Sequence, residues 1–133
     1  MPHQRRAVDS GAEWEHRYGY RRAIAVGDHA WVAGTTAASD GSQVSADAES
    51  QAKAAFAIAV RALGELDFDA TDVVRTRMYI VDPADADAVG RVHGEVFAAS
   101  RPVATMVVVR GLVDPALVVE IELDAQRAPS GAA

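Results

Sequence analysis

The segment Leu117-Val-Val-Glu-Ile-Glu-Leu-Asp124 decides the fold, because its side chains alternate between two kinds. One set is apolar and comprises Leu117, Val119, Ile121 and Leu123. The other set carries charge and comprises Val118, Glu120, Glu122 and Asp124. Alternation with a period of two is typical of a β-strand with one face on a core. The sequence therefore predicts a strand over 117–125 whose apolar face is covered.

A second segment, Asp72-Val-Val-Arg-Thr-Arg-Met-Tyr-Ile-Val81, shows the same pattern and is rich in β-branched and aromatic residues. Its apolar set is predicted to be Val74, Thr76, Met78 and Ile80, and its opposite set Val73, Arg75, Arg77 and Tyr79. In both segments the second set mixes charge with Val or Tyr. Such a surface suits a subunit interface with polar pockets as well as it suits exposure to solvent.

Working outward, three shorter strands are predicted at 23–26, 30–33 and 103–109, the first two joined by a Gly27-Asp28 turn. A long helix should begin after Ser45 or Asp47 and end with Gly64 as its C-cap. A second helix is predicted over 84–99, after the Asp82-Pro83 stop. The order ββαβαββ indicates an α+β (α/β) domain, one sheet with both helices packed on one face.

The chain has 133 residues, which is room for one domain. We expect that domain over 18–126, a partly ordered segment over 1–17 and a flexible tail over 127–133. The formal net charge of −6 argues against a general nucleic-acid binder. The absence of cysteine excludes disulfides, thiolate metal sites and a cysteine nucleophile. The four histidines show no metal-ligand spacing. No run approaches the roughly 18 apolar residues that span a bilayer. We therefore expect a cytoplasmic protein.

Several segments, in order and spacing, resemble the RidA/YjgF/UK114 family. They are Gly19-Tyr-Arg-Arg-Ala-Ile-Ala-Val-Gly-Asp28, Val32-Ala-Gly-Thr-Thr36, Asp72-Val-Val-Arg-Thr-Arg77, Asp82, and Leu117-Val-Val-Glu-Ile-Glu122. The resemblance covers roughly residues 18–125. It implies a chorismate-mutase-like fold with a mixed sheet. It also implies a homotrimer, in which three sheets form a central barrel with ligand clefts between subunits.

The resemblance further implies an activity. Active members hydrolyse reactive imines and enamines such as 2-aminoacrylate, giving 2-oxo acids and ammonia without a metal or organic cofactor. An imine carbon is already electrophilic, so a protein needs only to hold the substrate, position water and manage a proton. On this basis we expect no cofactor, a small-molecule substrate in an inter-subunit cleft, self-association, and neither membrane nor nucleic-acid partners.

Residue by residue, the resemblance assigns Glu120 to the acidic position proposed to position or activate water. Tyr20 matches an aromatic near the cleft. The family's carboxylate-binding arginine lies two residues after the proline that opens a strand, and here that position is Ala104, in Arg101-Pro-Val-Ala-Thr105. Alanine cannot bind a carboxylate, so the substrate is expected to shift away from simple 2-imino acids.

Alternatives stay open for the other candidates. Arg75 or Arg77 could replace the lost arginine clamp, or both could form ion pairs with Glu120, Glu122 or Asp124. Arg101 could reach back from its loop. Thr105 could hydrogen-bond a ligand, whereas Trp14 is interpreted as a packing anchor and Gly34 as a bulge or a close approach.

Three functions follow, in order of preference. The first is a hydrolase of small imines, enamines or a related amide, with Glu120 as the catalytic residue. The alternative is a non-catalytic ligand-binding or interaction trimer on the same scaffold. The third is an endoribonuclease, disfavoured by the acidic charge.

Overall fold

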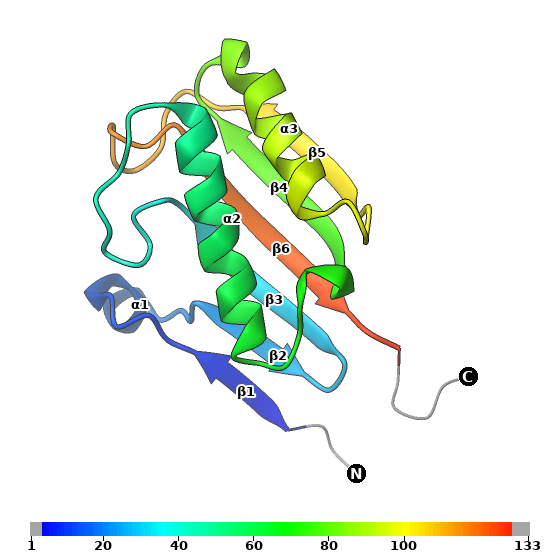
Figure 1. Ribbon diagram of the computed structural model, residues 1–133. Helices are drawn as coiled ribbons and strands as arrows, with labels where there is room; N and C mark the ends of the chain where they lie inside the picture. The colour runs from blue at the N-terminus through cyan, green and yellow to red at the C-terminus, as the bar shows by residue number, and fades with distance from the viewer. Residues whose placement is uncertain (1–3, 129–133) are drawn as a thin grey trace.

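The strand that the alternation predicts lies in the middle of the sheet. The computed structural model describes residues 4–128, and in it strand β6, Val119–Gln126, pairs antiparallel with a strand on either side. Val119, Ile121 and Leu123 have no exposed surface. The six strands run in the order β1-β2-β3-β6-β4-β5 (Figure 1). The covered apolar face is confirmed.

The strands on one side of β6 form a hairpin. Strand β2, Ala23–Val26, turns through Gly27 and Asp28 into strand β3, His29–Thr35, which pairs with β6. Gly27 has a φ of 58°, a left-handed conformation that glycine adopts without steric cost. On the other side, strand β4, Val73–Ile80, runs antiparallel to β6 and parallel to strand β5, Val103–Val108, at the sheet edge.

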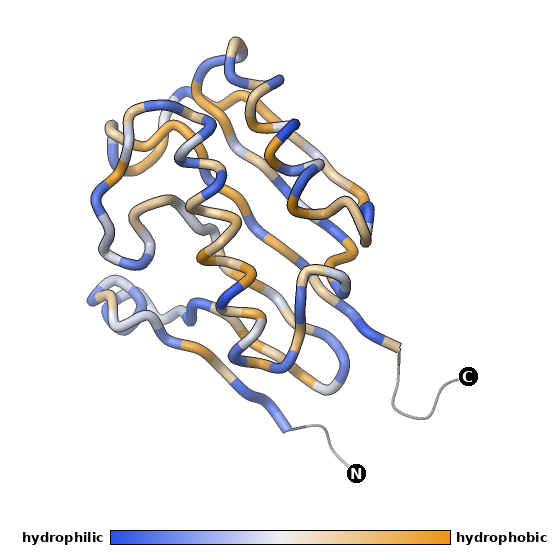
Figure 2. Tube along the Cα trace, in the orientation of Figure 1, coloured by the Kyte–Doolittle hydropathy of each residue, from blue (hydrophilic) through white to orange (hydrophobic). Residues whose placement is uncertain are grey.

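Two long helices cover one face of this mixed sheet (Figure 1). Helix α2, Ala48–Gly64, begins at Asp47, whose side chain accepts a hydrogen bond from the Ser50 amide at 2.9 Å. A short 3₁₀ turn, Pro83–Asp85, leads into helix α3, Ala86–Val96. Figure 2 shows hydrophobic residues concentrated along the strands, interrupted at intervals by hydrophilic ones. The predicted α+β fold with both helices on one face is confirmed, although Gly64 is the last helical residue and Glu65 takes the cap position.

One fully buried polar side chain joins α2 to the loop before β6. The Gln51 amide donates to the carbonyls of Ser45 and Ala116, at 2.9 and 3.1 Å, and accepts from the Val118 amide at 2.8 Å. These bonds satisfy three backbone groups and fix the end of the loop to the helix. In the part of the chain described here, no helix is long and apolar enough to cross a membrane.

The N-terminal segment is more ordered than the sequence indicates. Strand β1, Arg5–Val8, pairs with β2, and helix α1, Glu13–Tyr18, follows between Gly11 and Gly19. Both glycines have positive φ values, 85° and 75°. The short, polar β1 carries no clear alternation, so pairing with β2 creates a strand that local pattern does not predict.

A bulge in β4 reverses the predicted orientation of two side chains. The pairing of β4 with β6 shifts between Val73 and Arg75, so two residues there oppose one on the partner strand. As a result Val73 is buried and Val74 is 43% exposed, the reverse of the strict alternation predicted. From Thr76 to Ile80 the predicted faces are correct.

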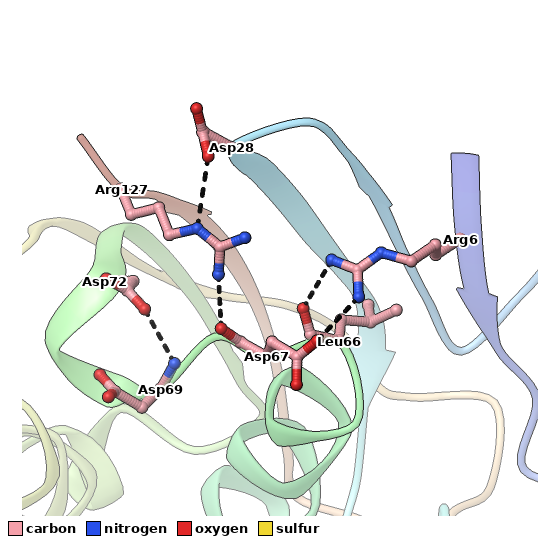
Figure 3. Close-up of polar contacts among 7 residues, drawn as sticks. All are labelled: Arg6, Asp28, Leu66, Asp67, Asp69, Asp72 and Arg127. Atoms are coloured by element: carbon pink, nitrogen blue, oxygen red, sulfur yellow. Dashed lines mark hydrogen bonds and ion pairs between the residues drawn. The ribbon is translucent and has the colours of Figure 1, made fainter. Parts of the chain in front are cut away.

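Two arginines from opposite ends of the chain bind the loop after α2 (Figure 3). Arg6 of β1 donates to the Leu66 carbonyl at 2.9 Å and to the Asp67 carboxylate at 3.0 Å. Arg127 donates to the Asp67 carbonyl at 2.5 Å and to the Asp28 carboxylate at 3.4 Å. Arg127 is therefore anchored rather than flexible, while 129–133 lie outside the described residues.

Residues 4–128 leave most of the sheet face opposite α2 and α3 uncovered, and we call it the open face. Its exposed apolar members include Val26, Trp31, Val103 and Val107. They lie beside the charged residues Arg75, Arg77, Glu122 and Asp124, in keeping with the mixed surface that the sequence predicts.

Candidate functional site

Glu120 lies at the centre of the candidate site. It stands on β6 opposite Tyr79 of β4, points to the open face and is half-buried. Burial raises the pKa of its carboxyl group above the ordinary value; the Arg22 charge opposes that rise in part, and Glu122 adds to it. A carboxyl group with a raised pKa in a cleft is the kind of group that proton transfer requires.

Gly34 makes room for this carboxylate. The pairing of β3 with β6 shifts between Val32 and Thr35, which places Gly34 in a bulge. A Cβ at position 34 would overlap Oε2 of Glu120 and lie 3.2 Å from its Cδ. Any larger residue would therefore push the Glu120 side chain aside. The structure shows both a bulge and a close approach at this glycine, the two roles that the sequence indicates.

Arg22 supplies a buried positive charge that the sequence analysis missed. It immediately precedes β2 and is only 6% exposed. One terminal nitrogen donates to the Gly34 carbonyl at 2.5 Å, while Nε has no partner within the described residues. Arg21 and Arg22 are adjacent and alike in sequence, and the period-two pattern places Arg22 on the same face as Ile24 and the exposed Val26, so the sequence carries no signal for its burial.

Glu120, Arg22 and Gly34 line an open cleft of about 770 Å³. Its aromatic wall consists of Trp14 and Tyr18 on α1 and Tyr20 just after it. The facing wall comes from the loop before β6 and includes Leu112, Val113 and Leu117. Three further carboxylates, Glu15, Asp40 and Asp114, lie along the lining, where Arg22 is the one cation among residues 4–128. The predicted residues Glu120 and Tyr20 are thus brought together.

Local contacts order helix α1, which contributes Trp14, Glu15 and Tyr18 to the cleft. The Trp14 and Tyr18 rings stack with centroids 5.4 Å apart, and the Arg17 guanidinium lies within 6 Å of both. Glu15 is buried and accepts hydrogen bonds from the amide and the hydroxyl of Ser10. Trp14 is 48% exposed and lines the cleft, so its interpretation as a packing anchor is wrong.

The predicted arginines of β4 lie elsewhere on the open face. Arg77 is 3.8 Å from the Glu122 carboxylate and 3.7 Å from that of Asp124, and Glu122 also accepts a 2.6 Å hydrogen bond from Tyr79. These are the ion pairs that the sequence offered as the alternative to a substrate clamp. Arg77 and Tyr20 both line a neighbouring depression. Arg75 is exposed.

Ala104 and Thr105 lie on β5, at the sheet edge, and both are exposed. Thr105 pairs with Arg77 and points to the open face. Ala104 pairs with Thr76, a buried residue whose hydroxyl is 2.8 Å from His93 of α3, so Ala104 points to the helix side. One chain alone therefore does not bring Ala104 to Glu120. Arg101 lies in the turn before β5, with a φ of 47°.

Histidines and carboxylates within residues 4–128 form no cluster of three that could hold a metal ion.

Comparison with known proteins gives the same assignment by three routes. The model of the family described as Endoribonuclease L-PSP matches residues 12–127. An uncharacterised protein of Streptomyces coelicolor, SCO2049, is 43% identical over 123 residues, 92% of each chain.

Solved structures agree in fold. Rv2704 of Mycobacterium tuberculosis, a member of the YjgF/YER057c/UK114 family, is 40% identical, with a TM-score of 0.86 over 93% of this chain and 100% of that one. PA3499 of Pseudomonas aeruginosa, a protein of unknown function, is 28% identical with a TM-score of 0.76 over 93% of each. Sequence and structure agree over nearly the whole chain, and the protein therefore belongs to the YjgF/YER057c/UK114 family, the family whose model is described as Endoribonuclease L-PSP.

Proposed function

We propose that this protein hydrolyses small reactive imines or enamines to a carbonyl compound and ammonia, with Glu120 as the catalytic residue. The observation that carries the proposal is a half-buried carboxyl group, with a raised pKa, in an open cleft that a small molecule can enter. The family membership supports the same activity through the resemblance described above.

The chemistry requires little from the protein beyond position. Water adds to the C=N carbon, the resulting carbinolamine transfers a proton to nitrogen, and the C–N bond breaks to give C=O and ammonia. Ionised Glu120 orients the water and accepts its proton; the protonated carboxyl then returns that proton to the leaving nitrogen. A raised pKa favours the second step, because the carboxyl group then holds its proton at a higher pH than an ordinary glutamate does. The proposal includes no cofactor.

The cleft lining supports a substrate other than a simple 2-imino acid. Four carboxylates face one cation, Arg22, whose terminal nitrogen is already bound to the Gly34 carbonyl. The walls are aromatic and aliphatic. An anionic substrate would meet net negative potential, whereas a neutral or cationic imine with an apolar group would not. Ala104 contributes to the same preference, since it cannot form the charge-assisted bond of an arginine.

We further propose a homotrimer with ligand clefts between subunits. The mixed open face and the exposed edge strand β5 are the surfaces that another copy would cover. In such an assembly Ala104, Thr105 and Arg75 of one subunit would approach the Glu120 cleft of its neighbour, where they would act as ligand-binding positions. The separation of Ala104 from Glu120 within one chain supports this arrangement.

The activity can be tested with two imines generated in situ by an amine or amino-acid oxidase with O₂ as oxidant, 2-iminopropionate from alanine and benzaldimine from benzylamine. Semicarbazide reacts faster with the imine than with the carbonyl product, so hydrolysis lowers the initial rate of semicarbazone formation. We expect benzaldimine to be the better substrate and Glu120→Gln to lower kcat by about 100-fold or more. Asp124→Asn, on the same strand face and outside the cleft, is the matched control.

Absence of any rate above buffer with both imines would overturn the hydrolase and favour a non-catalytic ligand-binding trimer. The description of the family favours a test of one further activity, endoribonuclease. The acidic cleft lining argues against it, because RNA binding needs cations along the phosphate backbone. Cleavage of a single-stranded RNA that Glu120→Gln abolishes would overturn the imine proposal in its favour.

The presence of Ala104 in place of a carboxylate-binding arginine gives a separate prediction. Ala104→Arg should lower the KM for 2-iminopropionate about 10-fold, because a guanidinium can bind its carboxylate. The KM for benzaldimine should not fall. Val108→Arg, exposed at the other end of β5, controls for added charge. An equal effect of the two variants on both imines would show that position 104 does not face the ligand.

A further inference from the structure

Arg22 is a buried cation whose burial the proposed reaction leaves unexplained. A guanidinium has five N–H donors, and removing it from water is costly unless they are paired. Here one terminal nitrogen is bound to the Gly34 carbonyl and Nε has no partner within residues 4–128. The fold keeps this charge at a cost, beside the one half-buried carboxylate of the cleft.

The backbone holds Arg22 firmly in this place. Its amide donates to the Val8 carbonyl of β1 at 2.8 Å, and its carbonyl accepts from the Ala33 amide of β3 at 3.0 Å. The side chain then reaches Gly34, one residue farther along β3. Arg22 thus connects three strands at the point where the bulge opens the space that Glu120 fills.

Gly34 links the two charges physically. Arg22 binds its carbonyl group, and the Glu120 carboxylate occupies the volume where a side chain at position 34 would begin. A shift of the bulge would therefore move the Glu120 carboxylate. We propose that Arg22 is a positioning residue for Glu120. It fixes the bulge that seats the carboxylate, and its charge favours the ionised form.

Arg22 differs in charge from the other groups named around Glu120. The groups that face it or line its cleft are Glu122 on β6, Tyr79 on β4, Glu15 on α1, and Asp40 and Asp114 in loops. All of these are acidic or neutral. With desolvation acting in the same direction, Glu120 without Arg22 would hold its proton up to a higher pH, so less of it would be ionised to accept a proton from water at a given pH. This chemical consequence rests on the proposed function; the positioning itself does not.

The decisive measurement is the titration of Glu120 by NMR. Its ¹³C carboxyl signal, assigned by its loss in Glu120→Gln, is followed against pH in the wild type and in Arg22→Met. Methionine fills a similar buried volume without charge. We expect the midpoint to rise by about one pH unit, as removal of a nearby opposite charge does. Arg21→Met is the matched control, since Arg21 pairs with Asp9 and is exposed.

A shift in Arg22→Met no larger than in Arg21→Met would overturn the proposal. Arg22→Lys keeps the positive charge but lacks the planar guanidinium group. Its Glu120 titration midpoint should therefore lie closer to the wild-type value than that of Arg22→Met. If Arg22→Met does not fold, Arg22→Gln, which also removes the charge, takes its place against the same control. An unchanged midpoint together with an unchanged rate at every pH would then contradict a role for the guanidinium.

Gly34 allows an independent test by stability. Gly34 does not have a positive φ, so its backbone accepts alanine, and the cost of Gly34→Ala comes from displacing Glu120. We expect Gly34→Ala to lower Tm by several degrees, and to cost much less in a Glu120→Ala background. Equal losses in the two backgrounds would show that the carboxylate is not seated against Gly34.

The pH dependence of imine hydrolysis provides a third test. With benzaldimine as probe, Arg22→Met should move the acid limb of the kcat profile upward by the same amount as the NMR midpoint, with a smaller effect on KM. An unmoved limb beside a shifted midpoint would overturn the link to catalysis. A wild type without hydrolase activity would overturn the proposed function alone, because titration and stability still test the positioning.

Discussion

At the scale of single residues, Glu120 occupies a place that disfavours its own charge. The carboxylate is half-buried on a sheet face, and burial is the largest cause of its raised pKa. An exposed strand position would have left it in water, with no such shift. A group in this state serves a reaction at the expense of stability, a common trade at functional sites.

The raised pKa of Glu120 predicts how the stability of the folded state changes with pH. Because the folded-state pKa of Glu120 is above its ordinary value of 4.5, the folded state binds the proton more tightly than the unfolded state. Stability from this group is therefore full at low pH and declines as the pH rises through the interval between the two values. Glu120→Gln removes the decline, so it should raise Tm at pH 7 and lose that advantage toward pH 4.

Thermal unfolding of both proteins between pH 4 and pH 8 provides the measurement. Glu65→Gln, at the exposed end of α2, controls for loss of one surface charge. A stability difference that is the same at all pH values, or that favours the wild type at pH 7, would contradict the prediction.

The sequence allowed part of the candidate site to be predicted. Glu120 could be identified because alternation placed it and the resemblance gave it a role. The burial of Arg22 could not, since it depends on a bulge in β3 that brings Gly34 over the side chain. Trp14 was misjudged for a similar reason: its exposure depends on where α1 lies, which nearby sequence does not specify.

At the scale of elements, Gln51 controls one wall of the cleft. It lies on α2 but bonds to Ala116 and Val118, in the loop that carries Leu112 and Leu117 along the lining. The wall therefore depends on the helix on the opposite side of the sheet. A buried amide that satisfies backbone groups at both ends rigidifies such a connection.

Gln51→Leu should destabilise the fold by about 3 kcal/mol, because it leaves buried backbone donors and acceptors unpaired. Gln43→Leu, at an exposed position in the preceding loop, should change stability by less than about 0.5 kcal/mol. Urea unfolding of both variants gives the comparison. A loss in Gln51→Leu as small as in the control would show that water replaces the amide.

The elements themselves show what sequence pattern can and cannot predict. β6, β4 and α2 were predicted nearly to their ends, because each has a long periodic pattern and α2 has a capping residue at Asp47. β1 has only four residues and gains its hydrogen bonds from β2, so its formation is a tertiary event. The bulge between Val73 and Arg75 likewise comes from pairing with β6, which inverted two predicted faces.

At the scale of the whole molecule, the open face is a surface that residues 4–128 leave without a partner. Trp31, Val103 and Val107 are exposed there beside charges that already form pairs within the chain. Exposed apolar side chains between charges that are already paired suit burial against another copy of the chain. The proposed trimer would bury it.

Light scattering should therefore give a mass near three times the 14.0 kDa of one chain at micromolar concentration. Val107→Asp should shift the mass toward the monomer, because a charge would be buried in the interface. Ala57→Asp, on the exposed side of α2, should leave it unchanged. A monomeric wild type would contradict the assembly, and an unchanged mass in Val107→Asp would remove β5 from the interface.

The position of β6 has a consequence for how the protein is made. The strand at the centre of the sheet, between β3 and β4, is also the last to be synthesised. Until residues 119–126 leave the ribosome, β2 and β3 cannot join β4 and β5, and the apolar sides of both helices have no complete sheet to cover. Most of the fold must therefore form after β6 has left the ribosome, in one step that pairs distant segments. Nascent chains that stall late would be exposed to aggregation and to chaperones.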